Sequence, residues 1–217
     1  SMTPIQYCKI EKYKECIQGP MRVPKGNKGQ LTIHNFGFYL SGSELYFVEE
    51  SHFLMEHFNK MLEGDYNNYS LRQILLALLE QLLTEDVLYL QKQEEHLAEL
   101  EEELLKRVPD YFYEMIMKYR KRLNIFHSYY EQLINMCDVM QTSVNIQLME
   151  EEKAEWQLFS NRAERLHDHV EMLREYLVQI RELYQSLIAV KQNQVMSILT
   201  VVTTIFLPLT LIVGWYG

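Results

Sequence analysis

The sequence has 217 residues, of which 30 are acidic and 21 are basic, so that the formal net charge is -9. This surplus of negative charge argues against non-specific binding to nucleic acids, which depends on Lys and Arg, and favours a surface that attracts cations. The three cysteines, Cys8, Cys16 and Cys137, form no CxxC pair and are odd in number, which indicates reduced thiols in a cytosolic compartment rather than a disulfide framework.

Residues 1–62 are predicted to form a partial α/β domain. A strand is expected within residues 5–13, and the Gly- and Pro-rich residues 19–30 are expected to form a loop. Two β-rich runs, residues 31–40 and 44–49, flank a polar Ser-Gly-Ser turn and predict a hairpin. Residues 52–62 have the apolar spacing of a short helix.

Residues 70–145 are predicted to form an antiparallel helical hairpin. Ser70 followed by Gln73 fits a capping box, and from there one continuous helix is expected to run to about residue 107. Pro109 ends it, and a second helix over residues 110–141 is expected to run back beside the first. We interpret the acidic run near the turn as a solvated helix face rather than a metal site; it comprises Glu94, Glu95, Glu99, Glu101, Glu102 and Glu103.

Residues 146–194 are predicted to form a stalk helix that starts near residue 147. Its apolar seam repeats in steps of four and three residues, which is a heptad pattern. The partner of this seam is either the preceding hairpin or other copies of the same helix. No Pro or Gly occurs from residue 147 to 207, so one helix of roughly 90 Å is expected. The seam comprises Phe159, Ala163, Leu166, Val170, Leu173, Leu177, Ile180, Tyr184 and Leu187.

Residues 195–217 contain no charge and are predicted to form a transmembrane helix, which needs about 20 apolar residues. Pro208 and Gly214 are tolerated in such helices. One face mixes amide and hydroxyl oxygens with apolar groups, as a gated path for a hydrated cation requires; the alternative is that its Asn and Thr side chains bond neighbouring helices. The face follows Asn193, Met196, Leu199 or Thr200, Thr203 and Leu207.

The sequence gives little indication of a zinc site or an enzyme active site. His167 and His169 are two residues apart and point to different sides of a helix, and His52 and His57 are also poorly spaced, so no zinc site is expected. The sequence contains no Gly-rich phosphate loop, HExxH pair or nucleophile motif. The chain is therefore not expected to be an enzyme.

Three stretches carry a resemblance to a known family. The final KQNQVMSILTVVTTIFLPLTLIVGWYG resembles the start of the first transmembrane helix of the CorA family of divalent-cation transporters, and Tyr216-Gly217 match the first half of that family's Tyr-Gly-Met-Asn signature. ELEEELLKRVP resembles the acidic tip between its two cytosolic helices, and REYLVQIRELYQSLIAVKQNQVM resembles its stalk. The implied fold class is α+β, with a small β-rich N-terminal part, a long antiparallel helical hairpin and a very long stalk helix that continues into the membrane.

The resemblance implies a homopentameric channel with a funnel-shaped cytosolic body. Its cargo would be Mg²⁺, with Co²⁺ and Ni²⁺ as alternatives, Mg²⁺ would also be the candidate regulatory ion, and no organic cofactor is implied. The location implied is the bacterial plasma (inner) membrane, with residues 1–194 cytoplasmic. The implied roles are an entrance ring for Asn193, hydrophobic gates for Met196, Leu199 and Leu207, pore-side hydroxyls for Thr203 and Thr210, and the start of the selectivity loop for Tyr216 and Gly217.

Two departures from the family pattern affect these expectations. The chain stops before the Met-Asn pair and before a second membrane helix, so it is expected to be a fragment. Leu158 occupies the stalk position where the family often has an acidic residue, which leaves Glu155 and Glu152 as weak candidates for a regulatory metal. The alternative function is a membrane-anchored coiled-coil interaction protein without transport activity.

Overall fold

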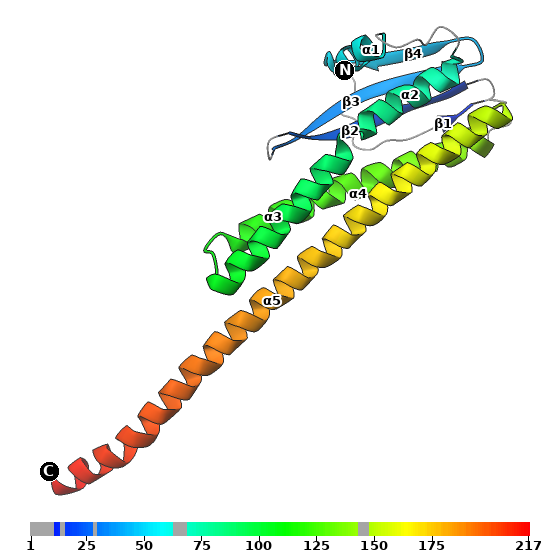
Figure 1. The fold of residues 1–217 in the computed structure, drawn as a ribbon. Coiled ribbons are helices and arrows are strands. Elements are labelled where there is room, and N and C mark those ends of the chain that lie inside the picture. Colours follow the sequence, from blue (N-terminus) through cyan, green and yellow to red (C-terminus); the bar gives the residue numbers. More distant parts are fainter. Residues whose placement is uncertain (1–10, 14–15, 28–29, 63–68, 143–147) are drawn as a thin grey trace.

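The computed structural model of the protein describes residues 11–13, 16–27, 30–62, 69–142 and 148–217. A small antiparallel sheet at the N-terminal end is followed by long helices, the last of which extends far beyond the rest of the chain (Figure 1). The predicted α+β class, with a β-rich part, a helical hairpin and a very long final helix, is confirmed.

In the described part of the chain, four strands follow one another in space in chain order. They are β1 (Glu11–Lys12), β2 (Cys16–Asn27), β3 (Gln30–Ser41) and β4 (Leu45–Glu49). The predicted hairpin is the β3–β4 pair, and its turn closes when the amide of Glu44 donates to Ser41 Oγ at 3.1 Å. The strand expected within residues 5–13 lies mostly outside the described residues, and β1 is its described part.

The loop expected at residues 19–30 is a strand over most of its length, because β2 continues to Asn27. Alternate side chains of β2 are buried, and they pair across the ladder with buried residues of β3, as in Ile17↔Leu40 and Met21↔Phe36. Beyond Gln18 the described part of β2 pairs only with β3. An edge strand accepts Pro where the missing N–H faces away from its neighbour, so the two prolines of this segment do not prevent strand formation.

Two short helices lie next in the chain, α1 (Phe53–Leu62) and α2 (Leu71–Leu83). Helix α1 was predicted, and it packs on the buried face of the sheet, where the rings of Phe53 and His34 stack with centroids 4.0 Å apart. The predicted capping box of α2 is confirmed, since Ser70 Oγ accepts from the amide of Gln73 and the Gln73 side chain accepts from the amide of Ser70.

The single helix expected from residue 70 to about residue 107 is wrong, because α2 ends at Leu83 and α3 (Asp86–Lys106) begins after a two-residue turn. Lys25 of β2 enters this turn. Its ammonium donates to the carbonyl of Leu82 and to Asp86 Oδ1, the latter at 3.3 Å. An uninterrupted helix would use the Leu82 carbonyl for the amide four residues later, so a cation supplied by the sheet stabilises the break.

Close approach of β2 to α3 also depends on Gly26. A Cβ at this position would lie 1.9 Å from Cε2 of Tyr89, far inside contact distance. The aromatic ring of α3 therefore occupies the space that any larger residue would need.

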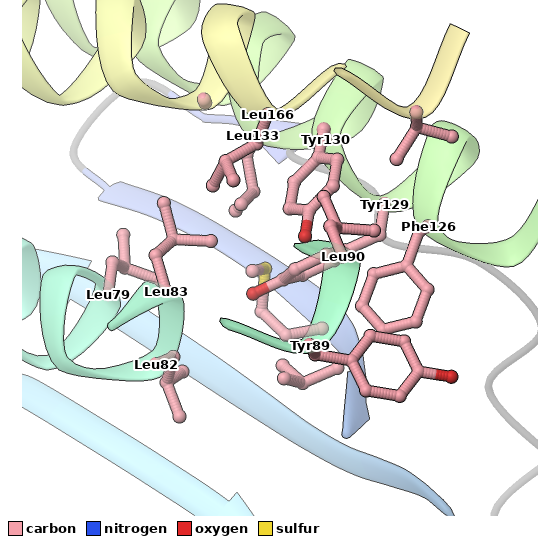
Figure 2. Packing of buried hydrophobic residues seen from close by; sticks show 14 of the residues in the cluster. Leu79, Leu82, Leu83, Tyr89, Leu90, Phe126, Tyr129, Tyr130, Leu133 and Leu166 are labelled. Carbon is pink, nitrogen blue, oxygen red and sulfur yellow. The ribbon is translucent and has the colours of Figure 1, made fainter. Parts of the chain in front are cut away.

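The hairpin predicted after residue 70 is formed by α3 and α4 (Phe112–Thr142), and α5 (Glu150–Tyr216) lies along both. The first seven seam residues, from Phe159 to Ile180, are buried against this hairpin. Of the two partners left open for the seam, the structure shows the preceding helices of the same chain. Figure 2 shows buried residues from α2 to α5 packed together: Leu79, Leu82 and Leu83 from α2, Tyr89 and Leu90 from α3, Phe126, Tyr129, Tyr130 and Leu133 from α4, and Leu166 from α5.

Helix α5 is continuous over 67 residues, about 100 Å at 1.5 Å per residue, and includes Pro208. The expected start near residue 147 lies outside the described residues, and the described helix begins at Glu150 after Met149 as N-cap. The ring of Tyr184 stacks on Phe112 with centroids 4.3 Å apart. This contact marks the region where α5 leaves the hairpin, and the predicted division between residues 194 and 195 coincides with no break in the helix.

Candidate functional site

The C-terminal part of α5 has no covering from the described chain. Every residue from Ala189 to Tyr216 is exposed, although those after Gln194 are all uncharged and most are apolar. Among the described residues, α5 is the one helix long and apolar enough to cross a membrane by length and composition. Burial inside the protein, the other explanation for an apolar helix, does not apply to this segment.

The predicted pore-lining residues lie on one face of this exposed segment. Because successive residues of an α-helix are turned by about 100°, the continuous helix aligns them in a stripe about 120° wide. No other described part of the chain contacts the stripe. Its assignment to a pore therefore stays a prediction; the stripe comprises Asn193, Met196, Leu199, Thr203, Leu207 and Thr210, and Tyr216 and Gly217 follow at the end of the helix.

The threonines of this segment donate their hydroxyl protons to the helix itself. Thr200 Oγ1 donates to the carbonyl of Met196 at 2.9 Å, and Thr210 Oγ1 donates to that of Phe206 at 2.9 Å. Thr203 makes the corresponding bond to Leu199. A hydroxyl whose proton is used in this way still presents oxygen lone pairs, so each side chain keeps the capacity to accept a further hydrogen bond.

Glu152 joins the N-terminal ends of α2 and α5. It is 2% exposed, and its carboxylate accepts from Ser70 Oγ, from Arg72 Nε at 3.2 Å and from the amide of Met149 at 3.0 Å. Burial acts to raise the pKa of this carboxyl, but the bonds from Ser70, Met149 and Arg72 outweigh burial, and the pKa is lowered. Three protein donors thus stabilise the charged form.

Glu155, the other candidate for a regulatory metal, and Leu158, which occupies the family's acidic position, are more accessible than Glu152. Glu155 is half-buried and accepts from Gln73 Nε2 at 3.1 Å. Leu158 is 66% exposed. The structure gives both glutamates hydrogen-bonded partners within the chain, and the prediction that they serve a regulatory metal is not tested by these contacts.

The acidic run of α3 is mostly exposed, and two of its members contact α5. Glu94 Oε2 lies 3.2 Å from His169 Nε2, and Glu101 accepts from the hydroxyl of Tyr176. Burial and this bond to Glu101 raise the pKa of Tyr176 to about 12. These carboxylates therefore fix the relative position of α3 and α5 in addition to facing solvent.

His167 and His169 point to different sides of α5, as expected, but His167 meets a residue that sequence spacing could not identify. Its Nε2 lies 3.2 Å from Nε2 of His127 on α4. Glu171, one turn further along α5, contacts the same His127 nitrogen. The two histidines are forty residues apart, and only the antiparallel register of α4 and α5 brings them together.

Comparison with known proteins gives a match over nearly the whole chain. The family model described as CorA-like Mg²⁺ transporter protein matches residues 2–217. The cobalt/magnesium transport protein CorA of Thermotoga maritima is 44% identical over 50 residues, a match that covers 23% of this chain and 14% of that protein. The matched stretch is thus a small part of that relative's length.

Solved structures resemble the fold over most of the chain. The CorA magnesium transporter of Methanocaldococcus jannaschii has a TM-score of 0.83 at 22% identity and is similar over 98% of this chain and 68% of its own. Full-length CmaX gives a TM-score of 0.77 at 17% identity, over 99% of this chain and 67% of its own. The cytoplasmic domain of ZntB from Vibrio parahaemolyticus gives 0.66 at 15% identity, over 84% and 73%. At these identities the likeness concerns the fold.

Proposed function

This chain belongs to the family of CorA-like Mg²⁺ transporter proteins, and from this premise we propose that it forms the cytosolic body and first membrane helix of a divalent-cation channel. The main support for the proposal is the exposed, uncharged end of α5. This end continues without a break from the earlier part of α5, which packs against α3 and α4. Because one continuous helix belongs to both the folded body and the membrane segment, a movement of the body can move the membrane segment.

The assembly proposed is a homopentamer in which the exposed stripe of α5 faces a central pore. Asn193 forms a ring of amide oxygens at the cytosolic entrance, and Met196, Leu199 and Leu207 form apolar constrictions that gate by excluding water. Thr203 and Thr210 present oxygens between them, a ligand type suited to hard cations that keep part of their water. Tyr216 and Gly217 begin the selectivity loop.

The cargo proposed is Mg²⁺, with Co²⁺ and Ni²⁺ as further ions, entering a bacterial cytoplasm through the plasma membrane with residues 1–194 inside. Moving a divalent cation through 100 mV releases about 4.6 kcal/mol, twice the value for a single charge. This driving force requires no ATP site, and the net charge of -9 favours the accumulation of cations near the protein.

The alternative of a membrane-anchored coiled coil has lost its main support. That interpretation required the heptad seam to be available to other chains, whereas Phe159, Leu166, Val170 and Leu173 are all 4% exposed or less within the single chain. Contact between copies is therefore assigned to the stripe after Ala189, where side chains are exposed.

Disulfide cross-linking tests the arrangement around an axis. In a background with Cys8 and Cys16 replaced by serine, Asn193→Cys is expected to give cross-linked oligomers on oxidation in membranes. Ile198→Cys, which is also exposed but lies on the opposite face of α5, is the matched control and should cross-link poorly. Efficient cross-linking at residue 198 and none at residue 193 would exclude a pore on the proposed face.

Ion uptake tests the function itself. The protein is expressed in cells that lack their own Mg²⁺ transporters, and Asn193→Ala is compared with the unchanged protein. We expect an altered rate of Mg²⁺ entry or an altered preference between Mg²⁺ and Co²⁺. Unchanged uptake and selectivity would remove Asn193 from the pore, and a mass in detergent that corresponds to a dimer or trimer would contradict the pentamer.

A further inference from the structure

Three side chains with nitrogen and oxygen ligand atoms meet between α4 and α5, outside the proposed pore. They are His127 of α4 and His167 and Glu171 of α5, and one ligand atom from each lies within 4.8 Å of the others. We propose that these residues form a binding site for a borderline transition-metal ion, with Zn²⁺ as the best fit. The proposal does not depend on the transport function.

The spacing of the two imidazole nitrogens fits a tetrahedral ion. Zinc binds imidazole nitrogen at about 2.0–2.1 Å, so two tetrahedral ligands are about 3.3 Å apart. Nε2 of His127 and Nε2 of His167 are 3.2 Å apart, and their rings meet at an interplanar angle of 44° rather than stacking in parallel. Glu171 Oε1 lies 2.5 Å from the same nitrogen of His127, which is closer than two ligands of one ion, so this carboxylate would shift outward to bind the metal. The site thus supplies three protein ligands and leaves a fourth position for water.

The backbone arrangement provides two ligands from one helix. His167 and Glu171 are four residues apart on α5, a spacing that places both side chains on the same face. Helix α4 provides His127 from the opposite side. All three side chains are partly buried, with exposed fractions of 24%, 24% and 39%, so a metal ion can reach the site from solvent.

Two charged residues, one basic and one acidic, lie next to the site. Arg174 contacts Oε1 of Glu171, the same oxygen that contacts His127, so metal binding would use Oε2 or displace the guanidinium. Nδ1 of His167 lies 3.7 Å from Asp168 Oδ1, on the side of the ring away from His127. A carboxylate near the second ring nitrogen is the usual outer partner of a metal-bound imidazole.

The chemistry of these ligands distinguishes the site from one for Mg²⁺. Imidazole suits Zn²⁺, Co²⁺ and Ni²⁺, whereas Mg²⁺ prefers oxygen ligands. A bound ion would connect α4 to α5 and fix the register of the hairpin that holds the upper half of α5. It would therefore give transition metals an effect on the cytosolic body that Mg²⁺ does not share.

Zinc binding to the untagged full chain in detergent micelles tests the proposal. Equilibrium dialysis against ZnCl₂ should give one Zn²⁺ per chain, which excess Mg²⁺ does not displace, together with a higher unfolding temperature. His127→Gln and His167→Gln should each weaken binding at least about 100-fold, the upper end of what loss of an outer partner alone costs. His169→Gln, which alters a histidine two residues away that contacts Glu94, should leave binding unchanged.

Several results would overturn the proposal. These are the absence of zinc binding by the unchanged chain, displacement of Zn²⁺ by Mg²⁺, unaltered binding in both His→Gln variants, or loss of binding in His169→Gln. Helical circular dichroism of the metal-free variants shows whether each has folded. If a histidine variant does not fold, Glu171→Gln, which preserves side-chain size, decides the question, and full zinc affinity in that variant would contradict the proposed ligand set.

Discussion

Replacement of Glu152 by Gln is expected to loosen the junction between α2 and α5. The carboxylate is 3% exposed and accepts bonds from Ser70, Arg72 and Met149. Glutamine has nearly the same shape, but it keeps only one acceptor oxygen and turns an N–H group towards one of these donors. The substitution therefore removes the negative charge and leaves at least one donor without its acceptor.

The loss of stability expected for Glu152→Gln depends on how deeply this ion pair is buried. Breaking a fully buried ion pair by removing one partner costs about 3–5 kcal/mol, and a hydrogen bond to a charged group contributes about 1.5–3 kcal/mol. The side chain of Arg72 is 20% exposed and retains access to water, so the lower range, that for a hydrogen bond to a charged group, applies. We expect a loss of about 2–3 kcal/mol, equivalent to about 5–10 °C in unfolding temperature for a chain of this size.

Thermal unfolding of the full chain in detergent, followed by circular dichroism, measures this loss. Glu151→Gln is the matched control, because it removes the same charge from the same first turn of α5 at an exposed position, and it should change stability by less than about 0.5 kcal/mol. Equal effects of the two substitutions would refute the role given to burial and hydrogen bonding.

The same comparison has a defined pH dependence. The pKa of Glu152 is lowered from its ordinary value of 4.5, because bonds from protein donors outweigh the effect of burial. The stabilisation is therefore fully present above pH 4.5 and is lost as the pH falls through the lowered pKa. A difference between wild type and Glu152→Gln that grows on acidification would contradict this account.

Three further substitutions or reactions test other parts of the fold. Gly26→Ala should cost at least about 1–3 kcal/mol in the same unfolding assay, because the added methyl group would overlap the ring of Tyr89. Burial raises the pKa of Cys137 to about 12, so its thiol should resist alkylation at pH 8 until denaturant is added, and rapid labelling of the native chain would contradict its burial. Burial also raises the pKa of Asp86, against the effect of Lys25; Lys25→Met should therefore destabilise the chain by about 3–5 kcal/mol at neutral pH. That cost should decrease as the pH falls and Asp86 becomes protonated.

The long helices could be predicted from sequence because their apolar spacing is local and repeated. The seam of α5 identified the buried face from Phe159 to Ile180, and the Ser70–Gln73 capping box identified the start of α2. Such signals depend on residues three or four positions apart, which the helix itself brings together.

The features that the sequence did not reveal depend on residues distant in the chain. The break between α2 and α3 requires Lys25, which lies 61 residues before Asp86 and comes from a segment interpreted as a loop. The pairing of His127 with His167 likewise depends on the register of α4 against α5. The strand character of β2 was missed because its glycines and prolines are unfavourable locally, whereas its pairing with β3 stabilises it.

For the predicted pore-lining residues, the sequence predicts their alignment on the helix but not what they contact. Their alignment on one face follows from the continuity of α5, which the absence of Pro and Gly before Pro208 made predictable. In the proposed pentamer they face other copies of the chain, and residue spacing along one helix does not identify such a partner. Their roles thus depend on the cross-linking and uptake experiments.

The unbroken length of α5 has a mechanical consequence. The stack of Tyr184 on Phe112 lies near the point where α5 extends beyond the α3–α4 hairpin. About 48 Å of helix extends from there to Tyr216. A rigid rod held at one end magnifies small rotations, so each degree of tilt at this support displaces the far end by about 0.8 Å. A rocking motion of four degrees in the cytosolic body would move the membrane end by about 3 Å, roughly the diameter of a water molecule, without any change in helical structure.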